Sequence, residues 1–347
     1  MHFLLSVTSG FLILVMTLAP ISEGYATTFK IATVAPEGSQ WMVDLKAAGK
    51  AIEEQTEGRV NLKLYGGGVM GTDKKVLRKI RIGQLQGGAF TTSGLSERYR
   101  DIIIYGLPMA FQTQAEVDYV RQRMDPILMK GLEDAGFVSF GFAGGGFAKL
   151  MGAEPIADLK DLRGSKVWVP EGDIVSYQAM EAMQLSPVVL PITDVLTGLQ
   201  TGLLEYVATP PAGAVILQWY TKVKYVTSVP FAYTVGILAI DKRAFNRISA
   251  ADQLIVRKVL SDVYKVFEVQ NQQDNLDAEK ALRSSGLEFI EVDPRLVPAW
   301  REITAASNRH MAEQGVFSVK LLDEFLGHIA DFHKGANTDP AALNSAE

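Results

Sequence analysis

The side chains that most often carry catalysis are few in this sequence and are not spaced as an active site requires. There is no cysteine, and the four histidines are His2, His310, His328 and His333. His328 and His333 are five residues apart, which places them on different faces of a helix, so no metal-binding pair is indicated. Ser93 has no nearby base, and no Gly-x-Ser-x-Gly elbow occurs. These observations predict that the chain is not an enzyme and needs neither a cofactor nor a metal.

Two glycine-rich segments, Gly66-Gly67-Gly68 and Gly144-Gly145-Gly146, raise the question of a phosphate-binding loop. Neither has the Gly-x-Gly-x-x-Gly spacing, and neither is followed by Gly-Lys-Ser or Gly-Lys-Thr. We therefore predict loops in which the backbone needs a positive φ angle or a close approach to its neighbours.

Strands and helices alternate along the first part of the chain. Residues 29–34 alternate as a strand does, and the turn at residues 36–39 leads into a helix. Residues 60–65 and 85–90 predict further strands, separated by a helix that Asp73 would cap. This alternation predicts a mixed or parallel sheet covered on both faces.

A change in composition near residues 153–155 predicts passage into a second α/β lobe. A strand at residues 137–142 is expected before this boundary. Strands at residues 166–169, 188–190, 223–229 and 234–240 and helices at residues 176–183 and 193–201 are expected after it. A periodic segment then runs from Ser249 to Arg283 and would span roughly 50 Å as a helix, longer than one lobe is wide. Such a helix must bridge the lobes, although residues 271–275 are polar on every side, so it is either solvated there or broken.

Composition and the N-terminal segment indicate an exported protein. Residues 3–20 are largely apolar and lead to Gly24-Tyr25-Ala26, the small-x-small pattern of a signal-peptide cleavage site. His2 is the only basic side chain before the apolar run, so an uncleaved anchor is the alternative. The formal net charge is only −5, with scattered cations, which argues against nucleic-acid binding. We expect a mature protein free in the periplasm.

The order and spacing of several motifs between Phe29 and about Phe332 carry a family resemblance. They are residues 32–41 (Ala-Thr-Val-Ala-Pro-Glu-Gly-Ser-Gln-Trp), Gly-Arg-Val at 58–60, the loop from Gly67 to Asp73, Ser93-Gly94, residues 162–166 (Leu-Arg-Gly-Ser-Lys) and residues 195–202. In this pattern the chain resembles the periplasmic P subunits of TRAP transporters. The resemblance implies a two-lobe α/β periplasmic binding protein fold with an interlobe cleft, a long spine helix and closure of the lobes on a small organic ligand. It also implies delivery of that ligand to the small and large TRAP membrane subunits.

Domain boundaries follow from this resemblance. We expect a signal peptide at residues 1–26 and a tail at 336–347. Lobe I is expected to comprise residues 27–150 plus about 237–270, and lobe II residues 151–236 plus about 271–335.

Three departures from the family pattern fall at positions that face the ligand in relatives. Ala148 stands where many relatives carry an arginine after Gly-Phe, and Val207-Ala208-Thr209-Pro210 where they carry Gln-Glu-Asn-Pro. Trp168 stands where they carry the arginine that binds a substrate carboxylate through two parallel hydrogen bonds. Because a buried carboxylate without a cation is costly, a small dicarboxylate is not expected.

An apolar cleft and a hydrophobic or amphipathic organic ligand are expected instead, including a monocarboxylate whose head group reaches a lysine. Trp168 would offer an aromatic face for stacking, although a second interpretation places it in the core of lobe II. Trp41, Trp219 and Tyr233 are likewise open to a cleft or a core position. The expected ligand-binding residues are Trp168, Phe147, Ala148, Thr209, Pro210, Val207, Ala208, Trp41, Ser93, Lys149 and Lys166.

Two acidic residues after Pro170 leave a further choice. Glu171 and Asp173 are either polar anchors for an amine on the ligand or, for Asp173, the N-cap of the following helix. The same departures also leave a second function open, a periplasmic signalling or scaffold protein that kept the fold without transport. That protein would have a filled cleft and a protein partner. The resemblance to P subunits that work beside a TPR-repeat protein adds such a protein to the possible partners.

Overall fold

The computed structural model describes residues 26–338. The predicted signal peptide therefore lies outside the described residues except for Ala26, as does the tail beyond residue 338. The strands are β1 (Thr27–Ala32), β2 (Val60–Tyr65), β3 (Gly87–Thr91), β4 (Phe137–Ser139), β5 (Ala143–Gly152), β6 (Lys166–Pro170), β7 (Ser186–Leu190), β8 (Tyr206–Thr209), β9 (Tyr225–Asp241) and β10 (Glu288–Ile290).

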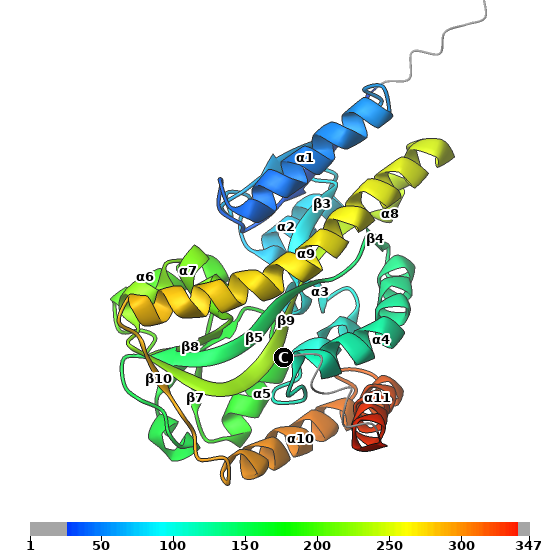
Figure 1. The fold of residues 1–347 in the computed structure, drawn as a ribbon. Coiled ribbons are helices and arrows are strands. Elements are labelled where there is room, and N and C mark those ends of the chain that lie inside the picture. Colours follow the sequence, from blue (N-terminus) through cyan, green and yellow to red (C-terminus); the bar gives the residue numbers. More distant parts are fainter. Residues whose placement is uncertain (1–25, 339–347) are drawn as a thin grey trace, which may run out of the picture.

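Helices cover the strands in both halves of the molecule (Figure 1). The longer ones are α1 (Gln40–Gln55), α2 (Asp73–Arg81), α4 (Gln114–Asp134), α5 (Ile174–Ala182), α9 (Ala250–Ser284), α10 (Val297–Glu313) and α11 (Val319–Thr338). Shorter ones are α3 (Thr92–Leu95), α6 (Val195–Gln200), α7 (Pro211–Ile216), α8 (Lys242–Phe245) and the 3-10 turns η1 (Arg100–Gly106), η2 (Leu159–Leu162), η3 (Ile192–Asp194) and η4 (Trp219–Lys222).

One mixed sheet runs through both halves in the order β2-β1-β3-β9-β5-β8-β6-β7. Parallel pairs lie at its two ends, β1 with β2 and β6 with β7, while β9 is antiparallel to both β3 and β5. Parallel neighbours need crossover connections, which helices between consecutive strands supply. The predicted two-lobe mixed α/β fold is confirmed, and β9 and β5 are the strands shared between the lobes.

Two expected strands, residues 223–229 and 234–240, are one strand of 17 residues, β9. Pro230 lies inside it, where the pairing with β5 shifts register around Lys149. A proline has no N–H to donate, so within a sheet it is tolerated at such an irregularity. The expectation of a break was wrong because the bulge accommodates Pro230 without ending the strand.

The segment after residue 136 also differs from the prediction. The expected strand at residues 137–142 is the short β4, and the three glycines at 144–146 lie within β5 rather than in a loop. The pairing of β5 with β9 shifts register between Gly144 and Gly146, and Gly146 has a φ of 98°. The expected need for positive φ is met at Gly146, inside a bulged strand.

Helix α9 is continuous over 35 residues. It begins after Ser249, whose hydroxyl accepts a hydrogen bond of 3.0 Å from the N–H of Asp252. At about 1.5 Å per residue it extends roughly 50 Å and crosses both halves of the molecule (Figure 1), packing on α1, β5 and α7. The polar stretch at residues 271–275 does not break it.

Candidate functional site

The two halves of the molecule approach closely where the loops after β2 and β6 meet the opposite half. A Cβ atom on Gly68 would lie 2.9 Å from Cγ2 of Thr193, and one on Gly172 would lie 3.4 Å from the carbonyl oxygen of Ser93. A Cβ on Gly68 would therefore be too close to Thr193, whereas one on Gly172 would make an ordinary contact; both glycines have positive φ angles. The two halves of the molecule therefore touch beside Ser93.

Several expected ligand-binding residues lie on two adjacent strands, β5 and β8. Lys149 pairs with Thr209 in the antiparallel register of these strands. Ala148 and Thr209 are buried, and Phe147 packs edge-on against Tyr233 with ring centroids 5.2 Å apart. The others on these strands or directly after them are Val207, Ala208 and Pro210.

Trp168 lies in the core of its half, on the face of β6 opposite to Val167 and Val169. Its side chain is 5% exposed, its indole N–H donates to the carbonyl oxygen of Leu190 at 2.9 Å, and its ring meets Trp219 edge-on at 5.1 Å. This is the core position that the sequence left as an alternative. A role of Trp168 as a stacking platform for a ligand stays a prediction.

The two lysines expected to receive a ligand head group have protein partners. Lys149 Nζ lies 2.9 Å from a carboxylate oxygen of Glu279 on α9. Burial raises the pKa of Glu279, but the hydrogen bonds from Lys149 and Arg283 outweigh it and the pKa is lowered. Lys166 is exposed at the start of β6, where its Nζ donates to the carbonyl oxygen of Gly202 at 3.3 Å.

Trp41 and Ser93 occupy different surroundings. Trp41 stacks on Phe267 of α9 with centroids 4.6 Å apart and ring planes 8° apart. Ser93 is buried, and its hydroxyl lies 3.1 Å from that of Thr91. Of these two, Ser93 is the one beside the contact between the lobes, through its carbonyl oxygen near Gly172.

Asp173 caps α5, as one of its two interpretations stated. Its carboxylate accepts hydrogen bonds from the N–H and the hydroxyl of Ser176 at 3.0 and 2.7 Å. Glu171 is exposed after β6.

A half-buried carboxylate that the sequence analysis assigned differently, Asp73, lies beside the lobe contact. The N-cap of α2 is Thr72 rather than Asp73, because the Thr72 hydroxyl accepts from the N–H of Lys75. Asp73 instead accepts a hydrogen bond of 3.2 Å from the hydroxyl of Thr91. Burial raises the pKa of Asp73 to about 6, and the charge of Glu171 across the lobe contact adds to the rise.

A second polar group that the sequence did not indicate is centred on Arg121 of α4. Its guanidinium donates to Glu268 at 2.6 Å, to Asp125 at 3.0 Å and to the carbonyl oxygen of Phe142 at 2.6 Å. Burial alone would lower the pKa of Arg121, but the charges of Asp125 and Glu268 raise it above its ordinary value. The N–H of Gly144 also donates to Glu268, at 3.1 Å, so the group holds the bulge of β5.

Two asparagine side chains of α9 also form hydrogen bonds with the bulge of β5. Asn271 donates to the carbonyl oxygen of Gly144 and Asn275 to that of Gly145, each at 2.9 Å. The side-chain amide oxygen Oδ1 of Asn275 accepts a hydrogen bond from the N–H of Ala212 at 3.1 Å. These bonds join α9, the shared strand β5 and the start of α7.

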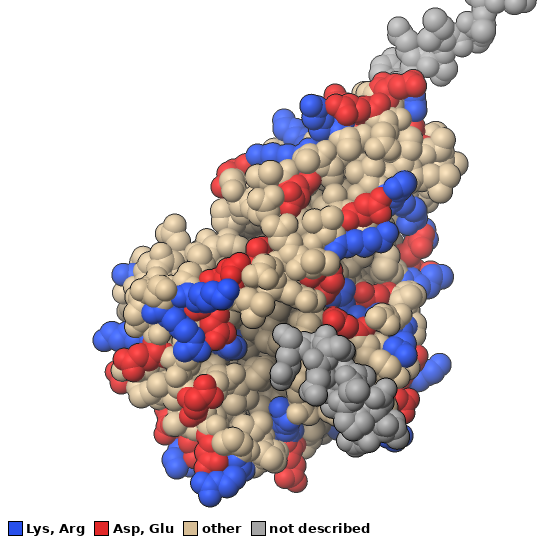
Figure 2. All heavy atoms as spheres, viewed as in Figure 1, with Lys and Arg blue, Asp and Glu red and all other residues tan. Residues whose placement is uncertain are grey.

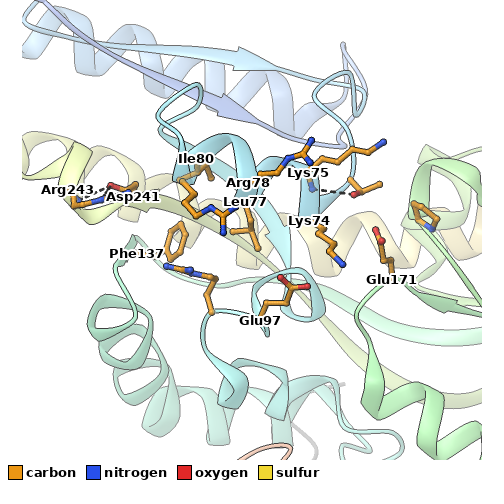
Figure 3. A pocket seen from close by; sticks show the side chains of 14 residues that line it. Lys74, Lys75, Leu77, Arg78, Ile80, Glu97, Phe137, Glu171, Asp241 and Arg243 are labelled. Carbon is orange, nitrogen blue, oxygen red and sulfur yellow. Dashed lines mark hydrogen bonds and ion pairs between the residues drawn. The ribbon is translucent and has the colours of Figure 1, made fainter.

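A hollow of about 530 Å³ lies on the side of α2. Figure 3 shows it between α2 and the facing segment that carries Glu171. None of the eleven residues expected to bind the ligand lines it. Within residues 26–338 no group of three or more acidic or histidine side chains is arranged to hold a metal ion, and no helix combines the length and apolar character that a membrane crossing requires.

Residues 31–314 match the family described as bacterial extracellular solute-binding protein, family 7 (DctP). The chain belongs to this family. Its members are solute-binding proteins of transport systems rather than enzymes, and TRAP solute-binding proteins of this kind bind small organic ligands and work with membrane subunits.

Relatives and solved structures agree with this assignment. The C4-dicarboxylate-binding periplasmic protein DctP of Rhodobacter capsulatus is 22% identical over 265 residues, which cover 76% of this chain and 79% of that protein. A TRAP periplasmic solute-binding protein of Ralstonia eutropha with bound (S)-2-acetolactate has a TM-score of 0.81 and 22% identity over 88% of this chain and 100% of that one. A Bordetella pertussis extracytoplasmic solute receptor binding pyroglutamic acid has a TM-score of 0.80 and 18% identity, with the same coverage. At these identities the solved structures show that the DctP-family chain shares their fold.

Proposed function

We propose that this DctP-family protein is the periplasmic receptor of a TRAP transporter and closes over a hydrophobic or amphipathic organic ligand. This class includes amphipathic monocarboxylates. It then passes the ligand to the small and large membrane subunits. Family membership supports the receptor role, and the ligand class is our extension of it. A TPR-repeat protein remains a further proposed partner.

One observation supports the proposed ligand class: both lysines expected at the site already have contacts within the protein. Lys149 is paired with Glu279, and Lys166 is exposed at the start of β6, where its ammonium group donates to the carbonyl oxygen of Gly202. The neighbouring positions are the apolar side chains of Ala148 and Val207. A dicarboxylate in this region would leave at least one carboxylate without a cation, which costs several kcal/mol.

The solved relatives indicate which alternative to test. They contain organic acids, among them acetolactate and pyroglutamic acid. For this chain, an acid would have to draw Lys149 away from Glu279. We therefore expect the apolar part of the ligand, rather than its charge, to supply most of the affinity.

The test is native mass spectrometry on protein purified from its own periplasm, followed by denaturing extraction of whatever is bound. The extracted solute is then added back during small-angle X-ray scattering to measure closure. A retained apolar or amphipathic molecule that compacts the protein supports the proposal. A small polar diacid refutes the ligand class, and absence of compaction with any extracted solute favours the signalling or scaffold alternative.

A further inference from the structure

The hollow beside α2 is lined by six cationic side chains and three carboxylates, on a chain whose net charge is −5. The cations are Lys74, Lys75, Arg78, Arg81, Arg98 and Arg243, and the carboxylates are Glu97, Glu171 and Asp241. On the face that carries α9, by contrast, acidic and basic side chains are interspersed (Figure 2). We call the five cations other than Arg243, with the hollow they line, the basic groove.

Within the part of the chain that the structure describes, the five cations of the basic groove form no ion pair. Arg243 is paired with Asp241, which is why it is left out. Within the described chain, no carboxylate lies within ion-pair distance of any of the other five. Arg98 instead contacts an aromatic ring, with its guanidinium 5.8 Å from the centre of the Phe137 ring.

Helix stability does not explain this charge. Arg78 and Arg81 lie in the last turn of α2, where cations are favourable to the helix dipole. Lys74 and Lys75 lie in the first turn, where they are unfavourable. Lys74 and Arg78 are also four residues apart, so their like charges repel on one face of the helix. Carrying these lysines costs stability, which points to a use outside the fold.

The spread of the cations indicates the size of the occupant. Lys74 and Arg81 are seven residues apart, roughly 10 Å along the helix axis, so a single carboxylate or phosphate cannot contact both. An extended peptide advances about 3.3 Å per residue, so a few consecutive acidic residues match the array. The floor of Leu77, Ile80 and Phe137 is apolar and can contact the methylene groups of such side chains.

We propose that the basic groove docks an acidic polypeptide segment of the membrane partner. The groove lies at the rim between the lobes, since Glu171 and Pro191 of the facing half also line the hollow. This proposal rests on the proposed receptor function, which supplies the partner. Charge complementarity gives such docking its speed and its selectivity against other surfaces.

The test measures binding of a fluorescein-labelled octaglutamate peptide to the full protein by fluorescence anisotropy, with octaglutamine as the uncharged comparison. The variant is Lys74→Glu/Arg78→Glu/Arg81→Glu. The matched control is Lys222→Glu/Lys224→Glu/Lys320→Glu, which makes the same change in net charge at exposed lysines that likewise form no ion pair among the described residues. We expect the groove variant to weaken binding at least about tenfold and the control less than about twofold, with binding falling as salt rises from about 50 to 200 mM.

Equal weakening by both variants, or no binding of octaglutamate, overturns the proposal. The proposal is also overturned if the unchanged protein binds phosphatidylglycerol vesicles or inorganic phosphate but not the peptide, and the groove variant loses that binding. The occupant would then be a lipid or a free anion. Circular dichroism checks that the groove variant is folded, and the milder Arg78→Gln/Arg81→Gln variant replaces it if it is not. Ligand-dependent compaction of the groove variant separates the two proposals, because the receptor function predicts that compaction survives the loss of peptide binding.

Discussion

Replacing Asp73 by asparagine should stabilise the protein at neutral pH. Burial raises the pKa of this carboxyl from 3.8 to about 6 in the folded protein. A carboxyl with a raised pKa binds its proton more tightly in the folded than in the unfolded state. Asp73 therefore contributes favourably to the free energy of unfolding at acidic pH, and this contribution is lost as the pH rises from about 4 to about 6. The shift from 3.8 to about 6 corresponds to roughly 3 kcal/mol.

The expected increase in the free energy of unfolding on replacing Asp73 by asparagine is smaller than the value that corresponds to the full pKa shift. The neutral amide keeps the shape of the carboxylate but replaces a charged hydrogen bond with Thr91 by a neutral one. We therefore expect Asp73→Asn to raise the free energy of unfolding by about 1–2 kcal/mol at pH 7.5. The difference should vanish near pH 4, where the native carboxyl is itself protonated.

Urea unfolding followed by tryptophan fluorescence, at several pH values between about 4 and 8, measures this difference. Asp252→Asn is the control of opposite sign, because the hydrogen bond from Arg59 lowers the pKa of Asp252. That stabilisation is present above the unfolded pKa of 3.8 and is lost as the pH falls through the lower folded value. The control should therefore destabilise at pH 7.5. If Asp73→Asn destabilises at pH 7.5, or its effect is independent of pH, the argument from burial is refuted.

Three further substitutions test the shared strand and the core. Arg121→Met leaves Glu268 without its buried cation and should lower the free energy of unfolding by about 3–5 kcal/mol in urea, with partial recovery when Glu268→Gln is added. Gly144→Ala places a Cβ 2.0 Å from the hydroxyl oxygen of Tyr233 and should lower the free energy of unfolding by about 1–3 kcal/mol. Adding Tyr233→Phe removes that oxygen and should restore part of the loss. If the double variant shows the full loss, the steric account is contradicted. Trp168→Phe removes the indole hydrogen bond and should lower the free energy of unfolding by about 1–2 kcal/mol. If the ring belongs to the core, calorimetric titration should show unchanged affinity for the extracted solute. A weakening of that affinity by about tenfold or more would instead place the ring at the ligand.

Local pattern was enough to predict most of the fold. Alternation identified the strand at residues 60–65 with its observed bounds, and periodicity identified the long helix after Ser249. The segment between Gly94 and residue 137 was left without a prediction, although it contains α4. Pro126 and several charges interrupt the apolar pattern of that helix, and burial of Arg121 and Glu116 there depends on partners far away in the sequence.

The candidate site could be predicted less well because strand alternation does not tell a cleft from a core when both faces are covered. Trp168 shares a face of β6 with Lys166, which suggested exposure. Lys166 is exposed because it begins the strand, whereas Trp168 lies two residues further in and packs edge-on against Trp219 in the core. Asp73 was expected to cap a helix, since a carboxylate at a helix start usually does. Its partner, Thr91, is 18 residues away.

Two features that looked unrelated in the sequence explain each other at the crossing of α9 over β5. A β-bulge disrupts the hydrogen-bond ladder of a strand, and an unpaired buried backbone group is costly. The bulge at Gly144–Gly146 is such a place, and Glu268, Asn271 and Asn275 of α9 bond its N–H and carbonyl groups. The helix is polar at residues 271–275 because the strand beneath it needs polar partners. The strand in turn needs glycine, since a Cβ on Gly146 would lie 2.6 Å from the Asn275 side chain.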